Sequence, residues 1–180
     1  MLRGERIGLR ARLDADVPIL HAELYDDATE WSRAHSQPWS PVAVESGRSP
    51  FVVTEPTAQT EQFSVVALDD DQLVGHALLW GIHSHNRSAH IGLALLSECR
   101  RRGYGTDIVA ALCHYAFVVR SLHRLQVDTL ADNAAMISAA EKNGFVLEGT
   151  LRRSAWLAGE FVDEVILGLL ADDWPHDHSG

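Results

Sequence analysis

A cationic segment with two glycines, CRRRGYGTD at residues 99–107, offers the most distinctive chemistry in the chain. At the start of a helix the first backbone N–H groups lack intrahelical partners and carry partial positive charge. Glycine lets the chain bend so that several of these groups converge on one anion. The segment is therefore predicted to bind phosphate through three arginines, two glycines and their neighbours: Arg100, Arg101, Arg102, Gly103, Tyr104, Gly105 and Thr106.

The spacing narrows the class of anion-binding loop. A Walker loop ends in Gly-Lys-Ser/Thr, which is absent, and the dinucleotide fingerprint needs a third glycine where Ile108 stands. What remains is Arg-x-x-Gly-x-Gly from Arg100 to Gly105, with a bend expected at both glycines and a helix from about Thr106. On spacing alone, an ordinary glycine turn with solvated arginines fits the segment equally well.

Hydrophobic periodicity predicts the elements that position this loop. Strands are expected at 5–13, at 62–82 as a pair joined at Asp69–Asp71, and at 88–96, 124–130, 146–157 and 160–170. Helices are expected after a cap at Asp14, near 28–35, over 106–122, and over 133–145. The strand at 88–96, the helix and the strand at 124–130 form one βαβ unit. Residues 26–60 are irregular and long for a plain connection, which is typical of a substrate wall or lid.

Length and composition favour one globular domain over residues 1–174 with a flexible tail at 175–180. The formal net charge is −10, which argues against a nucleic-acid partner and mildly favours a cationic one. The chain has no apolar run long enough to span a membrane and no secretory leader, so a cytoplasmic location is expected. The two cysteines form no metal-binding or disulfide pattern.

Three blocks of the sequence, taken in order, resemble the GCN5-related N-acetyltransferase (GNAT) superfamily, and in particular its RimJ/RimL-type branch. HIGLALLSECRRRGYGTD (90–107) is similar to the family's acyl-CoA strand and pyrophosphate loop. DNAAMISAAEKNGFVLEG (132–149) is similar to the branch's helix that begins with asparagine. GEFVDEVILGLLADDW (159–174) is similar to its closing strand and tryptophan.

The resemblance implies an α/β (α+β) fold with a mixed, mostly antiparallel, twisted sheet that splays in its middle and is flanked by helices. Acetyl-CoA would lie in the splay as co-substrate, without a metal. By position, backbone groups of Leu93 and Leu95 would bind the pantetheine, and the backbone of 101–106 the pyrophosphate. Asn133, Met136 and Ser138 would line the far wall. The family often forms homodimers, so the resemblance allows a homodimer here.

The implied reaction is direct transfer of acetyl to a primary amine, through a ternary complex and without a covalent enzyme intermediate. A backbone N–H near Leu93 to Leu95 would stabilise the oxyanion. An α-amine is partly neutral at pH 7, whereas deprotonating a lysine costs about 4.6 kcal/mol, at about 1.36 kcal/mol per pK unit. A lysine acceptor therefore demands more of a general base than an N-terminus does.

The candidate base is His90, which stands where the branch often has a glutamate, and Glu148 and Asp163 are alternatives. A histidine or carboxylate that merely fills a strand face is the competing interpretation for each. Many members carry a serine where this chain has Met136, so the general acid is Ser138 or a water. His83, His85 and His90 are not expected to form a metal site.

Two functions remain open from the sequence. One is an N-acetyltransferase acting on a protein N-terminus of ribosomal type or on a small amine such as an antibiotic or polyamine. Trp31, Trp39 and Trp80 would then wall the acceptor pocket together with residues 26–60. The other is an acyl-CoA-binding module that has lost turnover, an alternative kept open by the missing serine at Met136.

Overall fold

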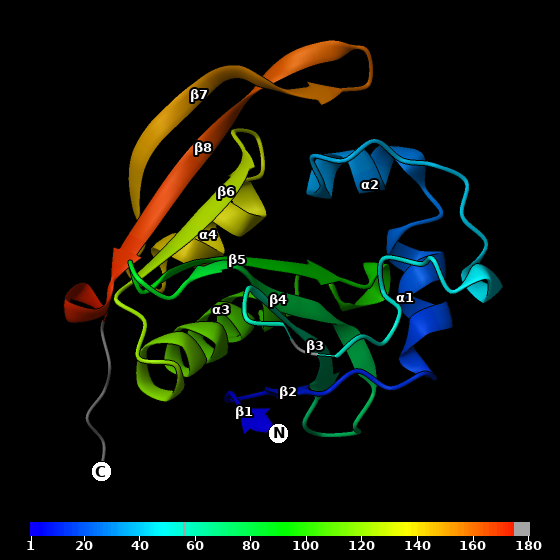
Figure 1. Ribbon diagram of the computed structural model, residues 1–180, viewed down its shortest axis with the longest axis horizontal. Coiled ribbons are helices and arrows are strands. Elements are labelled where there is room, and N and C mark those ends of the chain that lie inside the picture. The colour runs from blue at the N-terminus through cyan, green and yellow to red at the C-terminus, as the bar shows by residue number, and fades with distance from the viewer. Residues whose placement is uncertain (56, 175–180) are drawn as a thin grey trace.

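The computed structural model describes residues 1–55 and 57–174, and in this part of the chain eight strands form one sheet. The predicted flexible tail at 175–180 lies outside the described residues. The strands are β1 (Leu2–Arg3), β2 (Ile7–Arg10), β3 (Thr60–Ala67), β4 (Leu73–His83), β5 (Ser88–Leu95), β6 (Arg124–Leu130), β7 (Val146–Leu157) and β8 (Glu160–Leu170). Their spatial order is β1-β2-β3-β4-β5-β6-β8-β7 (Figure 1).

The sheet is antiparallel throughout except between β5 and β6, which run parallel. A parallel pair needs a long crossover, and here the connection contains α3 (Tyr104–His114). The predicted βαβ unit and the mixed, mostly antiparallel sheet are both confirmed. The turn between β3 and β4 falls at 69–71 as predicted, where Asp71 adopts a left-handed φ of 57° and Asp70 accepts a hydrogen bond from the Gln72 N–H.

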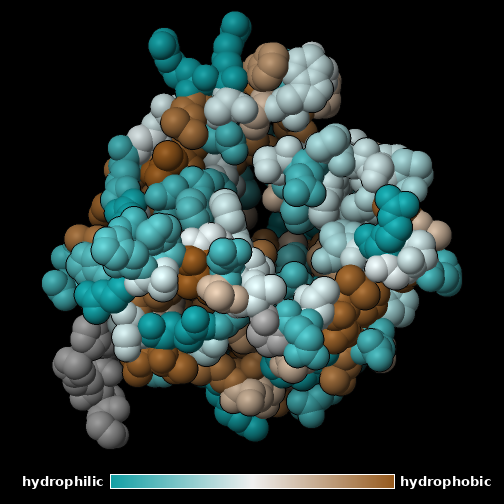
Figure 2. Space-filling view, viewed as in Figure 1, coloured by the Kyte–Doolittle hydropathy of each residue, from teal (hydrophilic) through white to brown (hydrophobic). Residues whose placement is uncertain are grey.

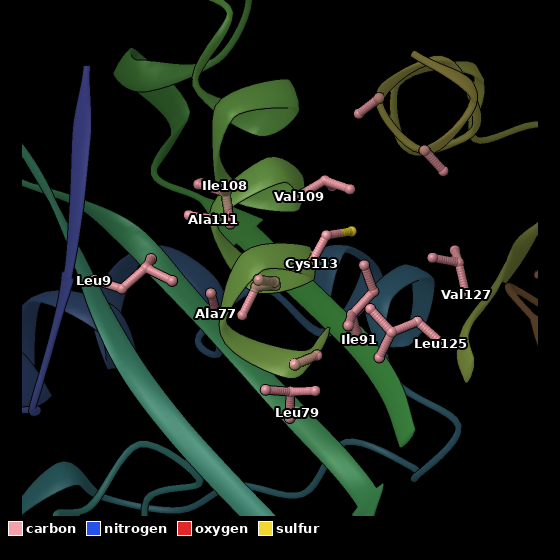
Figure 3. Close-up of a cluster of buried hydrophobic side chains, with 14 of the residues drawn as sticks. Leu9, Ala77, Leu79, Ile91, Ile108, Val109, Ala111, Cys113, Leu125 and Val127 are labelled. Atoms are coloured by element: carbon pink, nitrogen blue, oxygen red, sulfur yellow. The ribbon is translucent and has the colours of Figure 1, made fainter. Parts of the chain in front are cut away.

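The main core lies between the sheet and the helices α3 and α4 (Ala134–Glu141). Alternate residues of β2, β3, β5, β6 and β8 point to this side, as the period of two requires, and α3 contributes one apolar face. Figure 3 shows Ile108, Val109, Ala111 and Cys113 of α3 beside strand residues such as Leu79 and Ile91. Cys113 is fully buried, as its place in the helical pattern predicted, and burial raises the pKa of its thiol.

Two predicted helix boundaries are wrong. Asp14 does not cap the first helix: α1 (Asp16–Leu24) follows Ala15, which gives no side-chain cap. The carboxylate of Asp16 instead accepts hydrogen bonds from Arg10, Leu13 and Ser64. These contacts, and not a side-chain cap, hold the start of the helix. The helix predicted over 106–122 begins at Tyr104, and its α-helical part ends at His114; a π-helical turn, Tyr115–Val119, follows.

The long segment 26–60 is more ordered than its sequence indicates. It contains α2 (Ala28–Ala34), whose N-cap Asp27 accepts hydrogen bonds from the N–H groups of Thr29 and Glu30. A second core cluster lies beneath it, formed by Leu20, Leu24, Tyr25, Trp31, Phe51 and Leu96. Trp31 is 5% exposed and donates its ring N–H to the Gln37 carbonyl, and Trp39 donates to the Tyr25 carbonyl. Trp31 therefore fills the second core cluster instead of lining an acceptor wall, and Trp39 is half-buried against the same cluster.

The last two strands form an arm that projects beyond the sheet, defined as residues 151–163. β6 pairs only with Glu164–Leu170 of β8, so the remainder of the hairpin has no third strand. A bulge at residues 152–154 faces Asp163, whose carboxylate accepts a hydrogen bond from the Arg153 N–H. Figure 1 shows the arm arching toward α2, and its strand β7 contacts that helix.

Candidate active site

The central feature of the site is the point where β5 and β6 separate. Their parallel pairing covers three positions and ends at His90 and Gln126. Beyond that point β5 continues to pair with β4, while β6 pairs with β8. Figure 1 shows the two strands diverging, which confirms the predicted splay. Leu93 and Leu95 lie on the unpaired stretch of β5, so their strand has an edge open toward β6.

The predicted anion loop forms the entrance to α3. Arg101 and Gly103 have left-handed φ values of 63° and 84°, and Gly103 is the N-cap of α3 with no side-chain cap. The first N–H groups of the helix are therefore left for another acceptor. Gly105 does not form part of the bend, contrary to expectation: it lies within the first turn of α3, and a Cβ added there would meet nothing within 4 Å. These features fit a diphosphate held by main-chain amides.

The three arginines of the loop have different surroundings. The Arg100 guanidinium forms an ion pair with Glu30 of α2, at 3.0 Å, and donates to the Leu95 carbonyl. Arg101 and Arg102 are exposed, and neither guanidinium has a hydrogen-bond or ion-pair partner within residues 1–55 and 57–174. Two of the three predicted phosphate-binding cations thus have no partner in the described residues, and the third is paired with Glu30 of α2.

Asp107 anchors the loop to the N-terminal segment, a role that sequence reasoning missed. Its carboxylate accepts hydrogen bonds from the N–H groups of Glu5, Arg6 and Ile7 at 3.0, 2.8 and 3.0 Å. Arg6 also donates to the Arg102 carbonyl and lies over the ring of Tyr104, which is buried. Three backbone donors offset the negative charge that Asp107 places in the first turn of α3.

The far wall predicted for the co-substrate is the start of α4. Asn133 is the N-cap: its side-chain oxygen accepts from the Met136 N–H at 3.2 Å, and its amide donates to Thr129 at 2.9 Å. Met136 is half-buried against the main core, whereas Ser138 is exposed. The predicted helix start at Asn133 is confirmed, and its side chain is engaged in capping.

His90 lies at the last position where β5 pairs with β6, and its ring has neighbours on three sides. The Trp80 ring stacks on it with centroids 4.1 Å apart and planes 25° apart. Gly81 has a left-handed φ of 59°, and a Cβ there would lie 3.2 Å from the imidazole. On the β6 side, His90 Nδ1 lies 2.5 Å from Asp128 Oδ2.

A row of polar side chains on β6 supports this contact. Gln126 Nε2 donates to Asp128 Oδ1 at 2.8 Å, and Arg124 donates both to Gln126 Oε1 at 3.3 Å and to Glu148 on β7. The sequence did carry a signal for this row, because Arg124, Gln126 and Asp128 alternate with buried residues on one face of β6. The pattern marks an exposed strand face, but it cannot reveal that the face meets His90.

The other two candidate bases have structural partners. The hydrogen bond and charge of Arg124 lower the pKa of Glu148, which makes this carboxylate a weaker base than usual. Asp163 accepts the Arg153 N–H inside the bulge of the arm. These contacts do not exclude either residue, but they favour His90, whose Nε2 has no hydrogen-bond partner in the described residues.

The side of the splay opposite α3 is enclosed by α2 and the arm. Ion pairs connect α2 to both of the separating strands. Glu30 pairs with Arg100, which follows β5, and Arg33 pairs with Asp132, which follows β6, at 2.7 Å. Figure 2 shows a hollow near the centre of the molecule, between the part that carries the arm and the part that carries α2. Trp80 is 41% exposed, which leaves it the one of the three predicted wall tryptophans with a largely accessible ring.

No group of three or more histidine, cysteine, aspartate or glutamate side chains in the described part of the chain could hold a metal ion. No helix in residues 1–55 or 57–174 is long and apolar enough to cross a membrane. Burial raises the pKa of the half-buried Cys99 thiol as well as that of Cys113, so neither residue has the thiolate character of a nucleophile.

The sequence is similar to known acetyltransferases. The acetyltransferase (GNAT) domain family matches residues 6–146. An uncharacterized N-acetyltransferase of Bacillus subtilis, YnaD, is 25% identical over 136 residues, which cover 74% of this chain and 78% of YnaD.

Two solved structures that contain coenzyme A share the fold. Spermidine N-acetyltransferase from Vibrio cholerae, in complex with CoA and spermine, superimposes with a TM-score of 0.83 at 19% identity, over 94% of this chain and 98% of that one. RimL, a ribosomal α-N-protein acetyltransferase in complex with CoA, gives 0.82 at 19% identity, over 96% and 98%.

Proposed function

The chain belongs to the GNAT acetyltransferase family and is an acyl-CoA-dependent N-acetyltransferase, and from this premise we propose that it moves acetyl from acetyl-CoA directly to a primary amine, with His90 as general base. Residues 1–174 would form the catalytic domain. The observation that carries the proposal is the half-buried His90, held by Asp128 where β5 and β6 separate, with its Nε2 unpaired among the described residues.

In this proposal the main chain positions the co-substrate. The amides of residues 101–106 would bind the pyrophosphate, with Arg101 and Arg102 adding charge. The open edge of β5 at Leu93 and Leu95 would hold the pantetheine and supply the N–H that stabilises the oxyanion. Acetyl-CoA supplies the activated thioester, so the chain needs only to bind, orient and accept a proton.

The proton transfer assigned to His90 follows from the state of the acceptor. An amine attacks the thioester only as the neutral base, so its proton must leave before or during attack. Histidine commonly acts as a general base of this kind. The neutral nitrogen then bonds to the thioester carbon and loses a second proton, the C–S bond breaks, and the thiolate of coenzyme A takes up one proton, delivered by Ser138 or by water.

The acceptor is proposed to be a cationic primary amine, drawn by the net charge of −10. Two subclasses fit: a protein N-terminus, as in the RimJ/RimL-type branch, or a small amine. One of the similar structures is of a spermidine N-acetyltransferase and the other of a ribosomal α-N-protein acetyltransferase, so the shared fold accommodates both.

The experiment measures release of the free CoA thiol from acetyl-CoA with a panel of amines. The panel consists of a lysine-containing peptide with a free N-terminus, the same peptide with a blocked N-terminus, and a polyamine. The mass of the product identifies which amine is acetylated. We expect turnover with at least one member above the rate without amine. Saturable binding of acetyl-CoA without turnover on any amine would favour the alternative, a binding module.

Two further features of the proposal concern the whole protein. A homodimer, which the resemblance allows, stays a prediction and is tested by light scattering at several concentrations. Exposed apolar residues on the arm, Trp156 and Phe161 at 60% and 58% exposure, form an edge-to-face pair at which an interface would be sought first. A cytoplasmic location likewise stays a prediction.

A further inference from the structure

The polar row on β6 defines which nitrogen of His90 carries the proton. We propose that Asp128 is a positioning residue that fixes His90 as the Nδ1–H tautomer and so leaves Nε2 as the proton acceptor. This inference rests on the proposed function, in which His90 is the base. It adds a second residue to the reaction and a specific atom to the first.

The argument starts from Arg124, which can only donate hydrogen bonds. Its Nη2 lies 3.3 Å from Gln126 Oε1, so the oxygen of this amide must face the guanidinium. The amide nitrogen then faces the other way and donates to Asp128 Oδ1 at 2.8 Å. The Glu148 carboxylate holds Arg124 from its far side. The orientation of Gln126 is thus fixed by a cation and needs no assumption about amide flips.

The next step concerns the charge of Asp128. Burial by itself would raise its pKa, but hydrogen bonds from His90 and Gln126 lower it overall, so the carboxylate is ionised at neutral pH. An ionised carboxylate can only accept. The 2.5 Å contact between Asp128 Oδ2 and His90 Nδ1 therefore requires a hydrogen on Nδ1. In the neutral ring this places the lone pair on Nε2.

The ring is also held against rotation. Trp80 stacks on one face, and Gly81 leaves just enough room beside the imidazole because it lacks a Cβ. The side chain of His90 is 29% exposed and that of Asp128 is 26% exposed, so water reaches the pair without displacing it. The charged groups around the ring are Asp128 and, through Gln126, Arg124 and Glu148.

The test compares Asp128→Asn with the wild-type protein and with Asp69→Asn, an exposed aspartate in the β3–β4 turn that serves as the matched control. The asparagine keeps the size of the side chain but offers Nδ1 a donor as readily as an acceptor. Three quantities are measured: kcat/KM against pH, KM for acetyl-CoA, and the His90 tautomer in the free protein by long-range ¹H–¹⁵N NMR. The NMR signals are assigned with His90→Gln.

We expect Asp128→Asn to lower kcat/KM by on the order of 10²-fold, at the lower end of what a positioned general base contributes. KM for acetyl-CoA should not change, because the cofactor loop is untouched. The pH profile of kcat/KM should differ from that of the wild type, because the ionised carboxylate beside the ring is gone. The NMR spectrum should show Nδ1–H in the wild type and in Asp69→Asn, and a mixture of tautomers in Asp128→Asn.

An Nε2–H tautomer in the wild type at neutral pH overturns the inference. So does an Asp128→Asn protein that retains kcat/KM within twofold with an unshifted pH profile. The NMR measurement needs no turnover, so it decides the positioning claim even on a protein that acetylates none of the amines tested. Failure to acetylate any of the amines would overturn the proposed function alone.

Discussion

Two carboxylates of this protein, Asp16 and Asp128, both have lowered pKa values and both accept hydrogen bonds from a cationic or titratable partner. Asp16 is the first residue of α1, where Arg10, Ser64 and the Leu13 N–H donate hydrogen bonds to it and its side chain is 7% exposed. Asp128 lies at the splay and holds a ring that still has an unpaired nitrogen in the described structure.

The difference separates a polar cluster that is closed on itself from one that ends in an unpaired atom. A cluster whose donors and acceptors all pair internally stabilises the fold, and nothing in it is left to contact a substrate. A cluster that is well ordered but ends in an unpaired, accessible atom is suited to chemistry. Lowered pKa values occur in both, so the shift alone does not identify the site.

The largest effect expected is that of His90→Gln on catalysis. Loss of the general base should lower kcat/KM by at least about 10²-fold while KM for acetyl-CoA and the midpoint of urea unfolding stay near wild type. The matched control is His85→Gln, an exposed histidine in the β4–β5 turn. An equal loss in both variants, or no loss in His90→Gln, would contradict the assignment.

Asp16→Asn should show the opposite pattern, lost stability with unchanged kcat/KM in the remaining folded protein. Hydrogen bonds from Arg10, Leu13 and Ser64 outweigh burial and lower the Asp16 pKa from 3.8 to about 2. This corresponds to about 2 kcal/mol of unfolding free energy at pH 7.

Because the folded-state pKa of Asp16 lies below the unfolded one, this stabilisation is complete above pH 4 and is lost as the pH falls toward 2. Urea unfolding of wild type and variant should therefore differ at pH 7 and converge near pH 2. A difference that persists at low pH would mean that packing, and not the charge of Asp16, provides the stability.

The two glycines at the entrance of α3, Gly103 and Gly105, should respond differently to substitution by alanine. Gly103→Ala places a Cβ at a left-handed φ of 84°, which costs about 1–2 kcal/mol and disturbs the entrance of α3. Gly105→Ala lies in the first turn of α3 with open space around its Cβ, and should stabilise by about 0.5–1 kcal/mol. Thermal unfolding gives both values, and calorimetry with coenzyme A should show weaker binding for Gly103→Ala. Equal destabilisation would restore the double-glycine bend predicted from the sequence.

The smallest effect is expected from Glu148→Gln. Its partner Arg124 is partly exposed, so the pair contributes less than about 1 kcal/mol to stability. The variant should retain kcat/KM within about threefold, measured beside His90→Gln in the same assay. A loss as large as that of His90→Gln would make Glu148 the base.

The sequence predicted the entrance of α3 and the start of α4 well, because both depend on local patterns. A strand, a glycine at the helix entrance and a capping asparagine are all encoded within a few residues of where they act, as Gly103 and Asn133 show. The misplaced features are Asp14 and Gly105. A tertiary contact decided the first, and a helix that begins two residues earlier than predicted decided the second. Trp31 was misplaced for a related reason, since an apolar ring can line a pocket or fill a core and sequence does not distinguish them.

The amino-acid sequence by itself determined the order of the strands and helices, the anion loop and the choice of His90 as a candidate. Only the tertiary structure decided the partners of His90, because Trp80 of β4 and Asp128 of β6 lie on other strands than His90 and meet it through sheet pairing. Pairing joins positions tens of residues apart by main-chain hydrogen bonds that any side chain allows. The sequence therefore records that these residues are polar and outward-facing, while the register of three strands determines that they touch.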